Sequence, residues 1–415
     1  MRFVSQTALP PVLGSPLPMR RVVQRPARGV RLRGSGACDE PGFLGCIEIG
    51  MTTIRLNLSS PDRSHDVVVE RGILRRLHQE LRRVADFSRI GLVTDDIVRS
   101  HVGEPLQTEL RDRGMETVLF SFPAGEKTKS VETVLDLCRR LLASGFDRHS
   151  LLLAVGGGVV GDITGFAAAI YLRGIRYIQV PTTLLAQVDS AVGGKTGVDL
   201  SSGKNLIGSF HQPLLVVIDP GVLATLPREA MREGFAEVIK VALVADPTLL
   251  ELVEDHGAAL LDPLHGELEE VVLRACAAKC RVVSEDEQEA GLRRILNFGH
   301  TVGHALEAAS GYTLSHGRAV AVGMAAAIRC SERWSGLERA QATRALEVIE
   351  RLGLSTKIPP AVELEAVLAS LERDKKIQGE VCHFVLLGKI GSPVVKAIPI
   401  RNLRRELAEI LREMA

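Results

Sequence analysis

Short apolar segments that alternate with helical ones between Met51 and Pro227 constrain the fold of this chain most. Strands are predicted over residues 89–94, 117–122, 151–155, 177–180 and 214–219, and a helix is predicted over 131–143. Met51 opens Met-Thr-Thr-Ile-Arg-Leu-Asn-Leu, which alternates like a first strand. Strands that alternate with helices indicate a parallel sheet with helices on both faces. We therefore expect an α/β domain over residues 51–227.

A change of pattern after Pro227 predicts a second domain that is mostly helical. Helices are predicted over residues 228–244, 267–284, 301–309, 319–336 and 339–352, with a short strand pair near 383–387 and 394–398. The 415 residues are enough for two domains and a large core. We place this helical domain at residues 228–415.

Residues 1–50 differ in composition from the rest of the chain. They contain seven arginines and six prolines but no lysine, and no acidic residue precedes Asp39. The charge resembles that of an organelle transit peptide, which would direct the protein to a plastid. Serine is sparse, however, so we favour a disordered extension or a start site assigned too far upstream. In either of these cases we expect a cytoplasmic protein.

The overall composition argues against several classes of partner. A net charge of +1 gives no reason to expect nucleic acid or an anionic membrane, and no apolar run approaches the roughly 18 residues of a membrane helix. The seven cysteines form no CxxC pair, so neither a zinc ribbon nor a disulfide framework is indicated. A reducing compartment fits this cysteine usage best.

Three histidines near the middle of the predicted helical domain suggest a metal site. His300 and His304 lie four residues apart, and His316 follows twelve residues later. A spacing of four puts two imidazoles on one helix face, and neutral imidazole is a good ligand for Zn²⁺. The alternative is that these side chains only cap or pack. A polar face at helical spacing upstream favours a functional site, because burying such a face is costly; it comprises Glu289, Arg293 and Asn297.

Glu237 and Lys240 lie on a predicted amphipathic helix, on one face with Val241 and Val244. A surface ion pair would usually avoid such an apolar face. Glu237 is therefore a candidate third metal ligand with Lys240 as an adjacent cation. An ordinary i,i+3 ion pair remains the alternative.

A glycine-rich turn after the strand at 151–155 suggests a nucleotide site. Gly156-Gly-Gly-Val-Val-Gly-Asp162 follows a strand and opens a helical run. Glycines allow close approach to a pyrophosphate, and a helix amino terminus offers free N–H groups. Asp95, at the end of an earlier strand, could accept hydrogen bonds from a ribose. A packing turn is the alternative, and the charged loop Gly125–Lys129 could add contacts or simply be solvated.

Two further glycine-rich segments, Asp189–Gly197 and Gly203-Lys-Asn205, are predicted as turns that carry Lys195, Lys204 and Asn205. Several donors close together suit a phosphorylated or carboxylated substrate. The GxxxxGK[ST] spacing of a P-loop is absent around Lys195.

Taken together, these motifs resemble those of the 3-dehydroquinate synthase family over essentially all of residues 51–415. The matching segments are Gly156–Asp162, Tyr171-Leu-Arg-Gly174, Pro181-Thr-Thr183, Asp189–Gly197, Gly203–Asn205, Thr225-Leu-Pro227, Ala236–Lys240, Glu289–His304, Ser315-His316-Gly317 and Asp374-Lys-Lys376. The resemblance implies a Rossmann-like NAD-binding domain, a helical metal- and substrate-binding domain, and an active site in the cleft between them.

The resemblance also implies roles for individual residues. NAD would contact Asp95, Glu126, Lys129, Gly157, Gly158, Asp162, Thr182, Thr183, Lys204 and Thr225. Zn²⁺ or Co²⁺ would be held by Glu237, His300 and His316. Substrate would contact Arg173, Asp189, Lys195, Asn205, Lys240, Lys279, Arg293, Asn297 and Lys375, or Lys376 in place of the last. The catalytic groups would be His304, as a proton carrier rather than a metal ligand, with Glu289, Lys195, Lys240 and Asp189.

The implied reaction belongs to the shikimate pathway of aromatic amino acid and chorismate biosynthesis. It converts 3-deoxy-D-arabino-heptulosonate 7-phosphate to 3-dehydroquinate and phosphate by transient oxidation, elimination, re-reduction and aldol closure. The enzyme would be a lyase that works as a homodimer on a small molecule. The alternatives are another sugar-phosphate cyclase and a metal-dependent polyol dehydrogenase of the glycerol dehydrogenase type.

Overall fold

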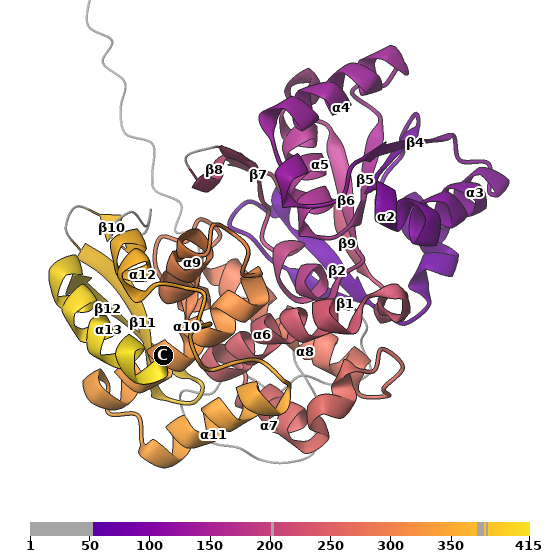
Figure 1. Cartoon of the computed structure of the whole chain (residues 1–415). Helices are drawn as coiled ribbons and strands as arrows, with labels where there is room; N and C mark the ends of the chain where they lie inside the picture. The colour runs from indigo at the N-terminus through magenta and orange to yellow at the C-terminus, as the bar shows by residue number, and fades with distance from the viewer. Residues whose placement is uncertain (1–52, 201–202, 372–376, 379–380) are drawn as a thin grey trace, which may run out of the picture. The chain divides into compact units, whose positions relative to one another are not determined.

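A seven-stranded sheet forms the centre of the amino-terminal half of the protein (Figure 1). The computed structural model describes residues 53–200, 203–371, 377–378 and 381–415. The predictions for residues 1–50 and for Lys375 therefore lie outside the described residues. The strands are β1 (Thr53–Leu56), β2 (His65–Val69), β3 (Ile90–Asp95), β4 (Thr117–Phe122), β5 (Leu151–Gly156), β6 (Arg176–Pro181) and β9 (Leu215–Ile218).

The strand order is β1-β2-β9-β6-β5-β3-β4, and every neighbouring pair is parallel except β1 with β2. The predicted parallel sheet is therefore confirmed, with one antiparallel strand at its edge. From β3 the chain moves outward to β4 and then returns to the other side of β3 as β5. In such sheets the place where the strand order reverses leaves a crevice beyond the carboxyl ends of the strands. Here that place lies between β3 and β5.

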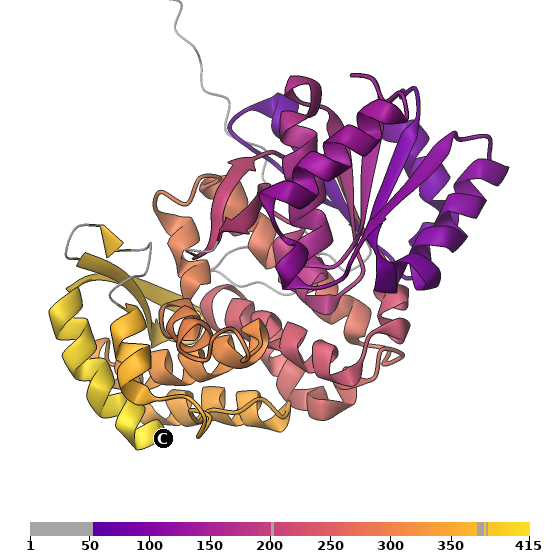
Figure 2. The same ribbon diagram turned by 45° about the horizontal axis from the view of Figure 1, so that its top comes forward.

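Helices cover both faces of the sheet, as predicted (Figures 1 and 2). They are α1 (Leu77–Val84), α2 (Asp96–Val98), α3 (Glu104–Asp112), α4 (Val131–Ala143) and α5 (Gly158–Ile170). Leu77 of α1 and Leu106 of α3 belong to one buried cluster, with Leu92 of the sheet. Leu137 of α4 and Ile163 of α5 belong to another, on the opposite face. Helices α1, α3, α4 and α5 thus each bury an apolar side against one face of the strands.

The predicted glycine-rich turn is present at residues 191–193. Lys195–Gly197 and Gly203–Asn205, however, lie in an antiparallel hairpin, which corrects the prediction for these residues. Its strands are β7 (Lys195–Leu200) and β8 (Gly203–Phe210). At Gly208 a Cβ atom would lie 2.1 Å from the carbonyl oxygen of Thr196, and at Gly197 it would lie 2.5 Å from that of Ile207. Glycine inside a strand often marks such close backbone approach rather than a turn.

The carboxy-terminal half is mostly helical, as predicted. Its helices are α6 (Arg228–Ala245), α7 (Pro247–His256), α8 (Leu268–Glu285), α9 (His300–Ala309), α10 (His316–Trp334), α11 (Arg339–Arg351), α12 (Leu364–Leu371) and α13 (Ile400–Met414). The short strands β10 (Ile377–Gln378), β11 (Val381–Lys389) and β12 (Ser392–Pro399) form a small antiparallel sheet. Among the described residues, no helix has the length and apolar character needed to span a membrane.

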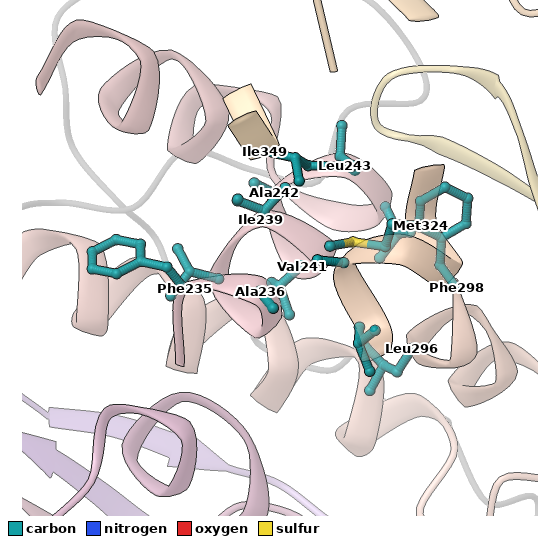
Figure 3. Close-up of a cluster of buried hydrophobic side chains, with 14 of the residues drawn as sticks. Phe235, Ala236, Ile239, Val241, Ala242, Leu243, Leu296, Phe298, Met324 and Ile349 are labelled. Carbon is teal, nitrogen blue, oxygen red and sulfur yellow. The ribbon is translucent and has the colours of Figure 1, made fainter. Parts of the chain in front are cut away.

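Helix α6 lies in the middle of the largest buried cluster (Figure 3). Figure 3 shows Val241 of α6 next to Met324 of α10, with Phe298, just before α9, on the other side of Met324. Residues of β2 and β9 that point away from α1 and α3 join the same cluster. Every residue of α6 from Gly234 to Val244 is buried, so the two polar side chains of this stretch, Glu237 and Lys240, are enclosed by their neighbours.

Candidate active site

Three side chains from three helices converge on one point. Glu237 of α6 is fully buried, and its Oε1 lies 3.4 Å from Nε2 of His300 on α9 and 3.4 Å from Nε2 of His316 on α10. Oε2 of Glu237 pairs with the Lys240 ammonium, whereas Oε1 faces the two imidazole nitrogens. A buried carboxylate oxygen is costly unless a hydrogen-bond donor or a cation compensates it, and a metal ion between Oε1 and the imidazoles would do so.

The spacing of these atoms suits a tetrahedral metal ion. Ligand atoms about 2.0–2.1 Å from zinc lie roughly 3.3–3.4 Å apart in a tetrahedron. Both distances from Glu237 Oε1 to the imidazoles have this length. The donor set of one carboxylate and two imidazoles also suits zinc or a similar divalent ion. Glu237, His300 and His316 therefore fit a metal.

The far nitrogen of each imidazole faces an oxygen that can accept a hydrogen bond. Nδ1 of His300 lies 3.2 Å from the carbonyl oxygen of Phe298, and Nδ1 of His316 lies 3.6 Å from Oε2 of Glu307. An acceptor at Nδ1 favours the tautomer that leaves the lone pair on Nε2. In both rings Nε2 is the atom that faces Glu237, so both rings are oriented to bind a metal there.

A second group, His304, Glu307 and His316, also brings ligand atoms within 4.8 Å of one another. An ammonium beside the carboxylate does not separate the two groups, because Lys204 Nζ donates to Glu307 Oε1 at 3.1 Å and Lys240 likewise pairs with Glu237. The distances do: Glu307 Oε2 lies 3.6 Å from Nδ1 of His316, whereas Glu237 Oε1 lies 3.4 Å from both imidazoles, the spacing of a tetrahedral zinc site. The group around Glu237 is therefore the better candidate, and His304 lies one helical turn from it, with its ring centroid 5.4 Å from that of His300.

Two lysines and a second carboxylate continue the buried cluster. Lys240 forms an ion pair with Glu237 and lies 3.7 Å from Asp189 Oδ1. Lys279 donates to the carbonyl oxygen of Asp189 at 2.5 Å and to its Oδ1 at 2.6 Å. The i,i+3 ion pair that was the alternative is thus present, but Lys240 is 1 % exposed, so the pair is buried rather than on the surface. The four groups comprise two carboxylates and two ammonium groups, whose formal charges cancel.

Burial and charge oppose each other in the pKa values of this cluster. Burial by itself raises the pKa of Glu237, but the Lys240 ammonium outweighs it, and the pKa lies below the ordinary value. Burial lowers the pKa of Lys279, and nearby Lys240 and Arg293 add to this effect although Asp189 opposes it. Burial also lowers the pKa of His316, but Glu237 and Glu307 reverse the shift and raise it to about 10. Without a metal, His316 therefore holds a proton at neutral pH.

The loop before His300 adds a second group of polar residues. Glu289 accepts hydrogen bonds from Lys195 of β7 and from Asn297 of the short helix η9 (Leu292–Asn297). Arg293 donates to the carbonyl oxygen of Gly193 through both terminal nitrogens, at 3.2 Å each. Glu289 lies in a loop, and Arg293 and Asn297 lie on a 3-10 helix, in which residues four apart do not share a face, so the predicted helical face is wrong.

The predicted nucleotide residues lie where the strand order reverses. Asp95 ends β3, and Gly156–Gly158 join β5 to α5. A Cβ atom at Gly158 would lie 3.1 Å from Ser190 Oγ, and one at Gly157 would lie 3.2 Å from Thr183 Cγ2. Thr182 Oγ1 is buried without a hydrogen-bond partner among the described residues. The amino terminus of α5 has no side-chain cap, and the Thr182 hydroxyl lies near it. Free N–H groups beside such a hydroxyl fit a bound pyrophosphate.

A buried ion pair connects this region with the hairpin. Lys129 Nζ lies 2.6 Å from Asp162 Oδ2 and donates to Asn205 Oδ1 at 2.5 Å. Burial raises the pKa of Asp162 to about 6, although Lys129 opposes the shift. Lys129 thus contacts both Asp162, another predicted nucleotide residue, and Asn205, which was predicted to bind substrate.

Other predicted residues are less closely associated with the site. Asp95 uses Oδ1 to cap α2 by accepting from the N–H groups of Ile97 and Val98, which leaves its other oxygen for a ligand. Arg173 is exposed, and its guanidinium makes no hydrogen bond or ion pair with the predicted site residues that the structure describes. The remaining nucleotide predictions are on short helices or a turn: Glu126 in η4 (Glu126–Thr128), Thr183 before η6 (Ala186–Ser190), and Thr225 in η7 (Pro220–Thr225).

Backbone strain is concentrated at predicted site residues. Of the five non-glycine residues with positive φ among those described, three were predicted to act on substrate: Arg173, Asn205 and Glu289. A fourth, Tyr312, has its ring 5.0 Å from Lys204 Nζ. Such conformations cost about 1–3 kcal/mol each and are found most often at functional sites.

One residue of the cluster was missed by sequence analysis. Glu307 is 3 % exposed and contacts both Lys204 and His316. Its position seven residues after His300 puts it near the same face of α9, which is the only signal in the sequence. A glutamate in an alanine-rich helix otherwise suggests a solvated side chain.

Comparison with known proteins identifies a family. The family model for the 3-dehydroquinate synthase amino-terminal region matches residues 119–233, and that for the carboxy-terminal region matches residues 234–377. The 3-dehydroquinate synthase of Nostoc punctiforme is 42% identical over 363 residues, covering 86% of this chain and 99% of the relative. That of Caulobacter vibrioides is 46% identical over 341 residues, covering 80% and 92%.

Solved structures of related cyclases have the same fold. A 2-deoxy-scyllo-inosose synthase, complexed with carbaglucose-6-phosphate, NAD⁺ and Co²⁺, has a TM-score of 0.78 at 27% identity, covering 86% of this chain and 100% of that one. The 2-epi-5-epi-valiolone synthase of Streptomyces hygroscopicus, with NAD⁺ and Zn²⁺ bound, has a TM-score of 0.77 at 34% identity, covering 85% and 97%. A glycerol dehydrogenase from Schizosaccharomyces pombe, at 16% identity and a TM-score of 0.59, shares the fold alone. On the family models and these identities, the chain belongs to the 3-dehydroquinate synthase family.

Proposed function

We propose that this protein is a 3-dehydroquinate synthase, a carbon–oxygen lyase that converts 3-deoxy-D-arabino-heptulosonate 7-phosphate to 3-dehydroquinate and phosphate. The observation that carries the proposal is the convergence of Glu237, His300 and His316 beside Lys240, Asp189 and Lys279. This arrangement puts three residues that fit a metal ion beside buried ammonium groups. The chain is 40–46% identical to 3-dehydroquinate synthases.

We propose NAD and a divalent metal, zinc or cobalt, as cofactors. The related cyclases of known structure carry NAD⁺ with Co²⁺ or Zn²⁺. When bound, NAD would supply reversible removal of a hydride, and the metal would polarise the oxygens that change oxidation state. The residues proposed to hold NAD are Asp95, Glu126, Lys129, Gly157, Gly158, Asp162, Thr182, Thr183, Lys204 and Thr225. Those proposed to hold the metal are Glu237, His300 and His316.

The substrate is proposed to lie between the hairpin and the loop that carries Glu289. Lys195 has a side chain that is 51% exposed, so its ammonium can reach a phosphate oxygen. Arg293 and Asn297 approach the same place from η9 and suit a carboxylate. The other proposed contacts are Arg173, Asp189, Asn205, Lys240, Lys279 and Lys375.

The proton transfers are proposed to use groups beside the metal rather than its ligands. His304 lies one turn from His300 on α9 and is half-buried, within reach of a substrate in the site. Glu289 is held by Lys195 and Asn297, which gives it a fixed position. Both can accept or return a proton at an oxygen or carbon of the substrate. The proposal includes a homodimer and a cytoplasmic location, which light scattering and cell fractionation of the native protein would test.

One assay tests the function. The purified protein is given the heptulosonate phosphate with zinc and a catalytic amount of NAD, and phosphate and dehydroquinate are followed. We expect one phosphate per dehydroquinate and no accumulation of NADH. Turnover of a hexose 6-phosphate in place of the heptulosonate would indicate another cyclase. Stoichiometric NADH formed from a polyol, with no phosphate released, would refute the proposal.

A further inference from the structure

Glu307 lies behind the metal ligand His316, on the side away from the metal position. Its carboxylate is buried on α9, seven residues after His300. Oε2 lies 3.6 Å from Nδ1 of His316, while Nε2 of that ring lies 3.4 Å from Glu237 Oε1. The two nitrogens of one imidazole therefore face two different carboxylates. Glu237 is on the metal side and Glu307 is on the outer side.

The other oxygen of Glu307 is fixed by the hairpin. Lys204, in β8, donates to Oε1 at 3.1 Å, and its ammonium also lies 3.8 Å from Glu126. With Lys204 on one oxygen and an imidazole opposite the other, the carboxylate has little freedom to turn. It joins a metal ligand of the helical region to a strand next to the proposed nucleotide residues.

We infer that Glu307 is a positioning residue of the metal centre, which accepts the Nδ1 proton of His316 and thereby directs Nε2 toward the metal. Histidine ligands commonly donate their second N–H to such a carboxylate, and removal of the partner weakens metal binding about 10–100-fold. His300 has a backbone acceptor, the Phe298 carbonyl, in the equivalent place. Of the two acceptors behind the histidine ligands, the Glu307 carboxylate can therefore be removed by a side-chain substitution, whereas the Phe298 carbonyl cannot.

The inference rests on the metal site of the proposed function, and its test separates the two. The full-length protein is stripped of metal with a chelator and titrated with Zn²⁺ against a chromophoric competitor. We expect Glu307→Gln, which keeps the shape of the side chain, to bind zinc about 10–100-fold more weakly than the unsubstituted protein. Glu237→Gln, which alters a proposed ligand, should lose more than this. The matched control is Glu254→Gln, since Glu254 also pairs with one cation, Arg344, and has no hydrogen bond or ion pair with the proposed ligands among the described residues.

Two further measurements guard against a merely structural effect. The visible absorption of the Co²⁺-loaded protein should change in Glu307→Gln and stay unchanged in Glu254→Gln, because it reports the orientation of the ligands. If Glu307→Gln fails to fold, Glu307→Asp retains the charge but withdraws the carboxylate by about one bond, roughly 1.5 Å. That variant should also bind zinc more weakly.

The outcomes are distinct. Zinc affinity within threefold of the unsubstituted protein in a folded Glu307→Gln or Glu307→Asp variant overturns the inference and leaves the proposed function intact. A loss in Glu307→Gln equal to or greater than that in Glu237→Gln also overturns it, because Glu307 would then be a ligand itself. Failure of the unsubstituted protein to bind zinc counts against the metal site of the proposed function.

Discussion

The contact between α9 and α10 offers a sharp test of how the metal site is built. Both helices carry a proposed ligand at their first residue, and they approach closely at Gly323 of α10. A Cβ atom at this position would lie 2.0 Å from the carbonyl oxygen of Gly299 and 2.8 Å from the nitrogen of Gly303. Both neighbours are backbone atoms of the first turn of α9, which carries His300. They cannot move without moving the ligand.

The magnitude follows from these distances. Ordinary contact begins at 3.4 Å, so Gly323→Ala requires the helices to separate by about 1.4 Å. Overpacking costs about 1–3 kcal/mol, and alanine in a helix regains roughly 0.5–1 kcal/mol relative to glycine. Because backbone cannot repack as a side chain can, we expect the upper part of that range, a net loss of about 2 kcal/mol. A metal site tolerates only about 0.2 Å in its ligand distances, so zinc affinity should fall at least about tenfold.

Urea unfolding of the metal-free protein and zinc titration against a chelator measure the two effects. Gly266→Ala is the matched control, since no atom lies within 4 Å of its added Cβ. Gly303→Ala should fall between the two, because its Cβ would lie 3.2 Å from the Ala319 carbonyl. A Gly323→Ala protein with the stability and zinc affinity of the Gly266→Ala control would refute the reasoning.

Three further predictions concern the charged and proton-carrying groups. His304→Ala should keep a near-normal zinc content while losing turnover, whereas His300→Ala and His316→Ala should lose zinc. Metal analysis of the purified variants measures this, and equal zinc loss in all three would contradict the division of roles. Lys240→Met leaves the buried Glu237 carboxylate without its ammonium partner. It should lower the free energy of unfolding of the metal-free protein, measured with denaturant, by about 3–5 kcal/mol, and by less with zinc bound; equal loss in both forms would count against the prediction. In the metal-free protein the pKa of His316 is raised from 6.5 to about 10, so its stabilising contribution is present below pH 6.5 and is lost as the pH rises through about 10. Because zinc must displace the His316 proton, zinc affinity should rise about tenfold per pH unit up to about pH 10. A zinc affinity that does not change with pH would contradict this prediction.

Much of the fold could be predicted because its elements carry strong local patterns. Helix α4 was predicted with its observed bounds, and α6, α9 and α11 were predicted to within one or two residues at each end. The β7–β8 hairpin was missed for a physical reason. Its glycines at 197 and 208 allow two strands to approach closely, and glycine without an alternating apolar pattern predicts a turn instead.

The candidate site was predicted in part. The structure brings Glu237, His300 and His316 together, but spacing alone had suggested His300 and His304 as the two ligands of one metal. The distinction depends on which helices pack against α9, and a single helix pattern carries no such information. Glu307 could not be recognised for the same reason, because its partners come from β8 and α10.

The cancelling charges of Glu237, Asp189, Lys240 and Lys279 have a consequence for the order of events at this site. A group of two carboxylates and two ammonium ions exerts little net field on an approaching anion. A divalent cation added to it leaves two uncompensated positive charges, about the number that a phosphate ester dianion brings. The attraction that these four groups exert on the substrate is thus conditional on the metal. Without the ion, attraction for the phosphate should depend on charges outside the cluster, such as the Lys195 ammonium.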